Sequence, residues 1–299
     1  MVLNIFLSLI FLPALWNAPI NSNGFLNLNN QATVAAQISV PQRLYSDYLG
    51  VKISAKSAVA VDATSGKILY KKNEAEVLPL ASITKLMTAL VFLDYNPGWQ
   101  TEWSTTPSDR RNGGIIYLNT GEILTLDNLF KTALIVSDND AAMALSRATG
   151  LNEDDFIAHM NSKARQLGLY NTHFADPTGL KIANQSTVSD LVKLLNFALQ
   201  NETIAKTTST SYYEFEVKGQ DKKRTVKLKN TDTLLKSYLN VLGGKTGSLD
   251  TAGYNLAVKI KGDKNQDIIV VVLGSQSNTD RFQDIKAVTD WVFNNWQWK

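Results

Sequence analysis

The 299-residue sequence contains no cysteine and only two histidines, His159 and His173. The absence of cysteine excludes thiol nucleophiles, disulfide bonds and cysteine-ligated metal sites. Two histidines are too few for a histidine-rich metal site, and a Ser-His-Asp triad would have to use one of them, although His159 lies in a helical pattern. We therefore expect no metal, no cofactor and a general base other than histidine.

An excess of charge of one sign is also lacking. The 30 basic and 27 acidic side chains leave a net charge of +3, and no basic tract is interleaved with aromatic residues. The short basic runs at residues 71–72 and 222–224 are typical of exposed hairpin ends. Nucleic acid is therefore not expected as a partner. The hydrophobic content of 44% is ample for a globular core.

The first apolar run of the chain, residues 2–16, is shorter than the roughly 20 residues that a membrane span needs. It also lacks a preceding positive charge and a following small-x-small cleavage site, which are typical of an export signal. We expect residues 1–22 to be a signal peptide or an N-terminal membrane anchor, residues 23–43 to be a linker, and residues 44–299 to be the catalytic domain. We expect no second β-rich domain at the C-terminus.

The domain carries strand patterns near both ends and helical patterns in the middle. The expected strands are residues 56–61, 67–72, 214–218, 224–228, 252–261 and 268–274. The expected helices are a segment that starts near Ser82 and residues 126–136, 141–149, 152–167, 188–200 and 280–298. This order predicts an α+β fold with an antiparallel sheet flanked by helices and an inserted all-helical subdomain. A cleft between the two parts is the natural place for a site.

Ser82 and Lys85 place a hydroxyl and an amine about one helical turn apart. Serine is unreactive until a base takes its proton, so the pair is a candidate nucleophile and base. Taken alone, the pair is more typical of a serine that caps a helix beside a solvated lysine.

Two further short motifs show that the Ser82–Lys85 pair is part of a larger, more specific set. Residues 137–139 (Ser-Asp-Asn) fall in a break between two expected helices, and residues 245–247 (Lys-Thr-Gly) open an expected strand. Each motif alone is weak. Ser-x-x-Lys, Ser-x-Asn and Lys-Thr-Gly in this chain order form the set found in penicillin-binding proteins and class A β-lactamases.

The residue types fit one chemistry. A helix start at Ser82 stabilises the alkoxide and the oxyanion. Lys85 acts as a base only when neutral, which burial beside Lys245 promotes through desolvation and like-charge repulsion. Ser137 can relay a proton to the leaving amine, and the Asn139 amide can hold Lys85 and a substrate amide at once.

The third motif fits substrate binding. Lys245 supplies a fixed positive charge for a substrate carboxylate, and Thr246 adds a hydroxyl group beside it. Gly247 has no side chain, so the strand edge can approach a ligand backbone closely.

From about Ser57 to Trp291 the chain resembles the D-alanyl-D-alanine carboxypeptidase and endopeptidase family of low-molecular-weight penicillin-binding proteins. The resemblance rests on the three motifs and on residues 171–180 and 252–256. It implies the β-lactamase/DD-peptidase-like fold, an acyl-enzyme on Ser82, and an oxyanion hole formed by the backbone N–H groups of Ser82 and Ser248. The implied catalytic residues are Ser82, Lys85, Ser137 and Asn139, and the implied substrate-binding residues are Lys245, Thr246, Gly247, Ser248 and Arg281.

Two features of the resemblance leave alternatives open. Arg281 falls about where some relatives place an arginine for the terminal carboxylate, but it fits an ordinary first-turn helix residue equally well. Ser248 and Leu249 follow the Lys-Thr-Gly motif where many members carry an aromatic residue or histidine and then threonine, which leaves the substrate preference open.

The sequence thus predicts a serine-type D-Ala-D-Ala carboxypeptidase that acts on peptidoglycan stem peptides and is inhibited by β-lactams. We expect export to the periplasm or the extracytoplasmic face of the cell wall, with the protein either secreted or anchored in the membrane through its N-terminal segment. The alternative is an endopeptidase of the same family that cleaves peptidoglycan cross-links. The sequence of residues 174–180 is closer to this endopeptidase branch.

Two other functions fit less well. A class A β-lactamase would need a Glu-x-x-Leu-Asn sequence between Asn139 and Lys245, and none is present. A non-catalytic module that binds peptidoglycan or senses β-lactams could have lost Ser82, Lys85 or Lys245, yet all three are retained.

Overall fold

The computed structural model describes residues 40–44, 50–219, 222–264 and 266–298. The signal peptide or anchor expected at residues 1–22 lies outside the described residues, as does most of the expected linker. Two residues of that linker form strand β1 (Gln42–Arg43), which pairs with β13 (Trp296–Gln297). Among the helices of the described ranges, none combines the length and the apolar character needed to cross a membrane.

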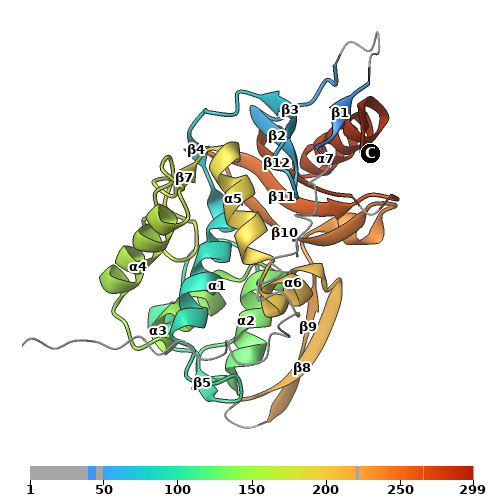
Figure 1. Ribbon diagram of the computed structural model, residues 1–299. Helices are drawn as coiled ribbons and strands as arrows, with labels where there is room; N and C mark the ends of the chain where they lie inside the picture. Colours follow the sequence, from blue (N-terminus) through green and yellow to red (C-terminus); the bar gives the residue numbers. More distant parts are fainter. Residues whose placement is uncertain (1–39, 45–49, 220–221, 265, 299) are drawn as a thin grey trace, which may run out of the picture. The chain divides into compact units, whose positions relative to one another are not determined.

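The central sheet joins strands from both ends of the domain, as the sequence predicts (Figure 1). Its five strands are antiparallel in the order β10-β11-β12-β2-β3. Their bounds are β2 (Ser57–Asp62), β3 (Ile68–Lys72), β10 (Asn240–Leu249), β11 (Gly253–Lys261) and β12 (Asp267–Ser275). Strand β10 lies at one edge of this sheet, and its hydrogen-bonded neighbour there is β11.

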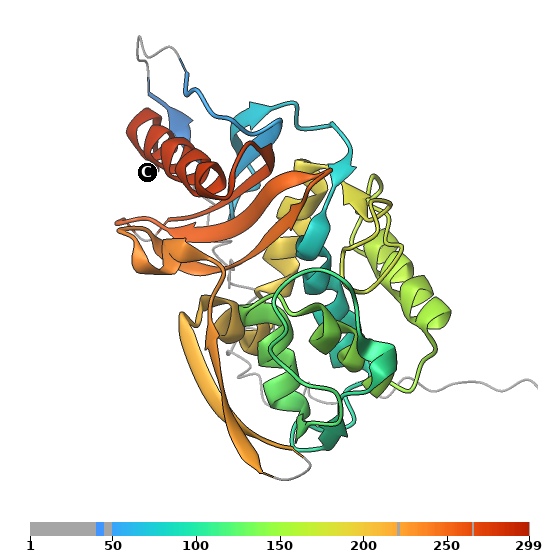
Figure 2. The same ribbon diagram turned by 180° about the vertical axis from the view of Figure 1, so that it is seen from behind.

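Helices cover both faces of the sheet, which explains why its middle strand β12 is an almost uninterrupted apolar run. Helix α7 (Asn278–Asn295) packs on one face through residues such as Ile285 and Val288. Helix α5 (Val188–Ala198) packs on the other face, and helix α1 (Lys85–Asp94) packs against α5. Figures 1 and 2 show α5 and α7 on opposite sides of the sheet.

The expected helices of the middle segment are confirmed, with small differences at their ends. They are α2 (Leu126–Ile135), α3 (Asn139–Ala148) and α4 (Glu153–Gln166), together with α5. Thr125, Asn152 and Thr187 cap α2, α4 and α5, since each side chain accepts a hydrogen bond from a backbone N–H of the first turn. The sequence did not predict α6 (Glu202–Ser209), which is short and rich in threonine, a poor helix former.

The expectation of an all-helical inserted subdomain is wrong. A four-stranded sheet lies in this part of the chain, in the order β5-β6-β8-β9. Its strands are β5 (Glu102–Ser104), β6 (Ile123–Thr125), β8 (Tyr212–Lys218) and β9 (Lys223–Lys229). The β8–β9 hairpin is predicted by the sequence. Strands β5 and β6 have three residues each, which is too short for a visible alternation of apolar and polar residues.

The segment that carries Ser82 is a 3-10 turn at Ala81–Thr84, and α1 begins only at Lys85. Neither the turn nor α1 has a side-chain cap, so the interpretation of Ser82 as a capping serine is wrong. The turn is held from outside instead. Asn255 on β11 donates to the carbonyl oxygens of Pro79 and Leu80 at 2.9 and 3.1 Å.

Two glycines let neighbouring backbone approach this turn closely. A Cβ atom at Gly179 would lie 2.0 Å from the carbonyl oxygen of Ala81, and one at Gly247 would lie 2.7 Å from the carbonyl oxygen of Leu80. Real Cβ atoms do not come so near, so only glycine fits at either position. The loop around Gly179 and the edge strand β10 therefore press on the turn from two directions.

We predict that Gly179→Ala destabilises the protein far more than Gly150→Ala. Both glycines have positive φ, +88° and +80°, which costs an alanine roughly 1 kcal/mol at either site. Only the methyl group at position 179 also meets backbone, whereas position 150 has nothing within 4 Å. We expect the free energy of unfolding, measured by urea denaturation, to fall by about 1 kcal/mol for Gly150→Ala and by about 3 kcal/mol for Gly179→Ala. Equal losses would contradict the close approach.

Candidate active site

The three motifs meet at a cavity of about 540 Å³. The residues that line it come from the Ser82 turn, the α2–α3 break, strand β10, helix α7 and the loop that precedes β6. They include Ser82, Ser137, Asn139, Thr246, Gly247, Ser248 and Arg281. Lys85 and Lys245 are each 1% exposed. Seven of the nine residues that the sequence singled out thus line the cavity, and Lys85 and Lys245 are buried next to lining residues.

Lys85 is the centre of the site. Its Nζ atom lies 2.8 Å from Ser82 Oγ, 2.7 Å from Asn139 Oδ1 and 2.8 Å from the carbonyl oxygen of Thr178. A neutral amine has two hydrogens and one lone pair. Because the amide and carbonyl oxygens can only accept, they take the two hydrogens and leave the lone pair for the Ser82 hydroxyl. This geometry suits a base that removes the serine proton.

Burial lowers the pKa of Lys85 to about 7. Two carboxylates, Asp138 and Asp176, oppose this shift by stabilising the charged amine. The sequence predicted that burial beside Lys245 would act on Lys85, and desolvation is indeed the main cause. The like-charge repulsion is seen at Lys245, whose pKa is lowered by burial and then by Lys85 and Arg281.

Ser137 lies in the break between α2 and α3 with a φ of +62°, which a non-glycine residue rarely adopts. Its hydroxyl oxygen is buried and has no hydrogen-bond partner among the described residues. Such an orphan in a cavity wall is typical of a group that bonds to a substrate or a transferred proton.

The sequence placed Asn139 in the break between two helices, but in the structure it is the first residue of α3. The break is shorter because Asp138 caps α3, accepting a hydrogen bond from the N–H of Ala141 at 2.7 Å. The Asn139 amide nitrogen donates to the carbonyl oxygen of Gly113 at 2.9 Å, so the amide links Lys85 to the cavity wall.

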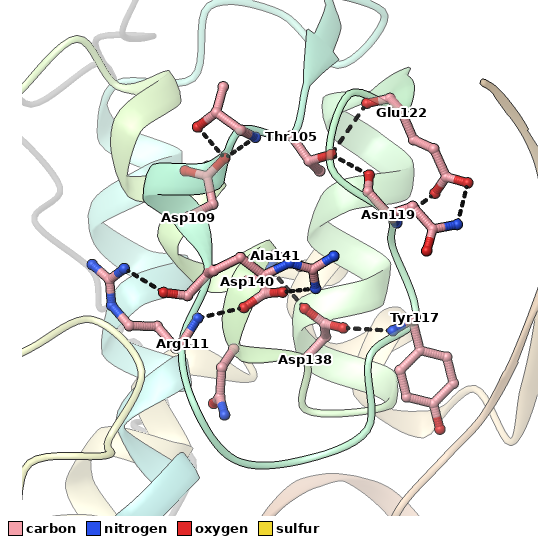
Figure 3. Close-up of polar contacts among 12 residues, drawn as sticks. Thr105, Asp109, Arg111, Tyr117, Asn119, Glu122, Asp138, Asp140 and Ala141 are labelled. Carbon is pink, nitrogen blue, oxygen red and sulfur yellow. Dashed lines mark hydrogen bonds and ion pairs between the residues drawn. The ribbon is translucent and has the colours of Figure 1, made fainter. Parts of the chain in front are cut away.

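Buried carboxylates hold that wall in place (Figure 3). Asp140 accepts from the Arg110 side chain and from the backbone N–H of Arg111, at 2.5 and 2.8 Å. Asp138 accepts from the N–H of Tyr117 at 3.3 Å, and burial raises the pKa of its carboxyl group to about 6. The loop between β5 and β6 is thus fixed on either side of its exposed stretch, residues 112–116.

The Lys-Thr-Gly motif lies in the middle of β10 and does not open the strand, because pairing with β11 begins at Asn240. A shift of register near Gly243 obscures this in the sequence. Thr246 Oγ1 lies 2.6 Å from Thr231 Oγ1. Arg281 is 6% exposed and donates from Nη1 to the carbonyl oxygen of Gly247 at 3.0 Å. Arg281 is therefore a buried residue of the cavity wall.

Sequence reasoning gave no role to several residues that shape the site. Asp176 accepts hydrogen bonds from Thr178, Gly179, Lys181 and Asn184, and so fixes the loop whose Thr178 carbonyl oxygen meets Lys85. Asn255, Thr231 and Asp232 were also missed. One sequence feature could have pointed to this loop and to Asn255: both fall in the stretches that carry the family resemblance.

Neither histidine lies at the cavity. His159 contacts the hydroxyl group of Tyr95 at 3.1 Å, and His173 forms a backbone bridge with Gln185. The expectation of a base other than histidine therefore agrees with the placement of both.

Comparison with known proteins agrees with the geometry. A family model described as D-alanyl-D-alanine carboxypeptidase matches residues 42–277. The D-alanyl-D-alanine carboxypeptidase DacF of Bacillus subtilis is 34% identical over 249 residues, covering 81% of this chain. The alignment spans 63% of DacF, less than two thirds of its length. The D-alanyl-D-alanine endopeptidase of Haemophilus influenzae is 36% identical over 237 residues, covering 78% of this chain and 80% of that protein.

A solved structure supports the same conclusion. The crystal structure of the Streptomyces K15 DD-transpeptidase is similar with a TM-score of 0.75 and 30% identity, covering 81% of this chain and 98% of that one. The α+β fold predicted from the sequence is thus confirmed. With a family match over most of its length, this chain belongs to the D-alanyl-D-alanine carboxypeptidase family of serine peptidases.

Proposed function

We propose that the protein is a serine-type D-Ala-D-Ala carboxypeptidase that acts on peptidoglycan stem peptides through an acyl-enzyme at Ser82. The observation that carries this proposal is the buried Lys85 amine. Its contacts with Asn139 and Thr178 leave one lone pair for the Ser82 hydroxyl, and burial lowers its pKa to about 7.

The reaction begins when the neutral Lys85 amine takes the proton from Ser82 Oγ. The oxygen attacks the carbonyl carbon of the penultimate D-alanine, and the backbone N–H groups of Ser82 and Ser248 stabilise the oxyanion. A donor of this kind contributes roughly 100-fold to 1,000-fold in rate. The C–N bond then breaks, and the proton that Lys85 took is relayed through Ser137, whose hydroxyl oxygen is unpartnered among the described residues, to the leaving amine of the terminal D-alanine. Water then hydrolyses the ester.

The substrate is bound at the side of the cavity that β10 forms. Lys245 and Thr246 bind the terminal carboxylate, and Arg281 fixes the backbone at Gly247. Gly247 brings the free edge of β10 next to Ser82, where a Cβ atom would lie 3.1 Å from the Ser82 nitrogen. A peptide laid along this edge would therefore present its scissile carbonyl carbon to Ser82.

Endopeptidase cleavage of cross-links is the alternative within the same family. The Haemophilus influenzae endopeptidase is about as similar to this chain as the carboxypeptidase DacF, at 36% and 34% identity. The two activities share the same attack on a D-alanyl carbonyl carbon and differ in the amine that leaves.

The location and the N-terminal segment follow from this substrate. Because peptidoglycan lies outside the cytoplasm, we propose that the protein is exported and works in the periplasm or at the cell wall. Residues 1–22 would serve as a signal peptide or an anchor, and residues 44–299 as the catalytic domain. β-Lactams, as mimics of the D-Ala-D-Ala end, would acylate Ser82.

The function is tested by D-alanine release from a pentapeptide that ends in D-Ala-D-Ala. We expect release by the wild type and none by Ser82→Ala, and we expect labelled penicillin to attach to the wild type alone. Cross-linked dimeric muropeptides in the same assay separate the two activities, since an endopeptidase converts them to monomers. A wild type that neither releases D-alanine, splits dimers nor binds penicillin would refute the enzyme hypothesis.

The rate of acylation should rise with pH around the pKa of Lys85, about 7. The amine is a base only when deprotonated, so its active fraction grows from pH 6 to pH 8. Lys85→Arg retains the positive charge but cannot lose its proton in this range. We expect acylation by penicillin to slow by about 1,000-fold in Lys85→Arg, without a pH-dependent recovery up to pH 9. A pH-independent rate in the wild type would exclude Lys85 as the base.

The protein should form a long-lived complex with penicillin. Among the described residues, the cavity-lining carboxylate is Asp250, which is exposed on the turn after β10. A β-lactamase needs a carboxylate that activates the deacylating water, and Asp138 and Asp176 are buried and bonded to backbone N–H groups. We expect stoichiometric inhibition. Rapid, repeated turnover of a chromogenic cephalosporin would contradict this prediction.

A further inference from the structure

Thr231 contacts the elements that carry the second and third motifs of the site. It lines the cavity, as Ser137 and Thr246 do. Its backbone N–H group donates a hydrogen bond at 3.1 Å to the carbonyl oxygen of Ile135, the last residue of α2. Its hydroxyl oxygen lies 2.6 Å from that of Thr246 on β10. One residue thus links the end of the helix that precedes Ser137 to the strand of the Lys-Thr-Gly motif.

The neighbours of Thr231 hold it in place. The Asn230 side chain donates hydrogen bonds to the carbonyl oxygens of Thr208 and Thr210, at 3.2 and 2.8 Å, where α6 ends. The amide oxygen of the same side chain accepts from the backbone N–H of Asp232 at 2.9 Å. Because this segment is anchored to both α2 and α6, the fold sets the position of the Thr231 hydroxyl group beside β10.

The hydroxyl groups of Thr231 and Thr246 carry two hydrogens, and their contact uses only one of them. Whichever group donates, the other keeps a hydrogen for which the described residues offer no acceptor. Both residues line the cavity, and Thr246 is 4% exposed. Buried hydroxyl groups are normally satisfied, so the remaining hydrogen indicates an acceptor that a ligand supplies.

Another hydroxyl pair of the protein is satisfied internally. Thr172 Oγ1 and Ser186 Oγ also lie 2.6 Å apart. Thr172 can donate to Asp190 Oδ2 at 3.1 Å, and Ser186 can donate to Thr172 or, at 3.2 Å, to the carbonyl oxygen of Thr187. Both hydrogens of that pair therefore have acceptors within the protein, and neither residue lines the cavity. The pair formed by Thr231 differs in both respects.

The direction of the hydrogen bond follows from the acceptor that a substrate brings. Thr246 can bind a substrate carboxylate only by donating its hydrogen, because carboxylate oxygens accept and do not donate. The oxygen of Thr246 is then the acceptor within the pair, and Thr231 is the donor. Hydrogen bonds in such a chain polarise one another, so the bond from Thr231 strengthens the bond from Thr246.

We propose that Thr231 is a positioning residue for substrate binding, whose hydroxyl group donates to Thr246 and thereby orients the Thr246 hydrogen toward the terminal carboxylate of the substrate. This inference rests on the proposed function, because it takes Thr246 as part of the site for that carboxylate. Thr231 acts through Thr246 and does not hold the carboxylate itself.

Three variants of Thr231 separate its hydroxyl group from its bulk. Thr231→Val removes the hydroxyl group and nearly preserves the shape of the side chain, Thr231→Ala removes it with less bulk, and Thr231→Ser retains it. Thr172→Val is the matched control, because it breaks a hydroxyl pair of the same length that does not line the cavity. We would measure KM and kcat for the D-Ala-D-Ala pentapeptide, and the second-order rate constant of acylation by labelled penicillin, which also carries a carboxylate.

For Thr231→Val and Thr231→Ala we expect KM about fivefold above that of the wild type, the effect of one lost hydrogen bond, with kcat changed by less than about twofold. The loss falls on KM because a carboxylate held away from the reacting atoms is bound equally in the ground state and the transition state. Acylation by penicillin should slow by about fivefold as well. Thr231→Ser and Thr172→Val should stay within about twofold of the wild type. An unchanged KM in both hydroxyl-free variants, or a Thr231→Ser variant as impaired as they are, would overturn the inference.

A double-mutant cycle tests whether Thr231 acts through Thr246. Once Thr246→Val has removed the partner hydroxyl group, the hydroxyl group of Thr231 should no longer affect KM or the acylation rate. We therefore expect Thr231→Val to change either quantity by less than about twofold in the Thr246→Val background, against about fivefold in the wild type. An equal effect in both backgrounds would show that Thr231 contributes independently of Thr246, and the positioning role would be refuted.

The experiment separates this inference from the proposed function. If the wild type neither releases D-alanine nor binds penicillin, the proposed function fails, and the role of Thr231 fails with it. If the wild type is active and both hydroxyl-free variants match it, only the role of Thr231 is refuted. In a wild type that splits cross-linked dimers without releasing D-alanine, the rate of acylation by penicillin provides the same test.

Discussion

The burial of the Lys85 amine is the constraint on which the rest of the site depends. A lysine that is 1% exposed must satisfy its hydrogen-bonding groups internally, and it does so with Ser82, Asn139 and the carbonyl oxygen of Thr178. These partners lie 3, 54 and 93 residues away in the sequence. One side chain thus ties α1, α3 and the loop before β7 (Gln185–Ser186) to the same point. The same burial lowers the pKa of the amine to about 7, which the proposed role as a base requires.

Most carboxylates near the site maintain structure. Asp176 organises the loop of Thr178 and Gly179, and Asp138 and Asp140 hold the loop between β5 and β6 against α3 (Figure 3). Their hydrogen bonds come largely from backbone N–H groups, which fix the direction of a loop without regular secondary structure. Asp232 differs, because its Oδ2 atom is buried without a hydrogen-bond partner among the described residues.

The edge strand β10 and the Ser82 turn come together because two positions lack side chains. Gly247 lies against Leu80, and Gly179 lies against Ala81 from the other side. Asn255 on the neighbouring strand adds hydrogen bonds to the backbone just before the turn. Closeness of this kind would bring a peptide on the strand edge next to the serine, as the proposed function requires. It also explains why the turn can keep its strained geometry, including a φ of +49° at Ala81, since the surrounding backbone leaves it little room to relax.

The sequence alone determined the central sheet, most of the helices and the residues proposed to react. Alternating and helical periods are local properties, and Ser82, Lys85 and Lys245 belong to motifs of three or four residues. Only the tertiary structure decided the rest. The short strands β5 and β6, the position of Lys245 within β10, and the roles of Thr178, Asn255 and Thr231 depend on contacts between segments far apart in the chain. The pKa of Lys85 also depends on the tertiary structure. Desolvation lowers it, and desolvation arises from all the segments packed around the amine and not from a single neighbour in the sequence.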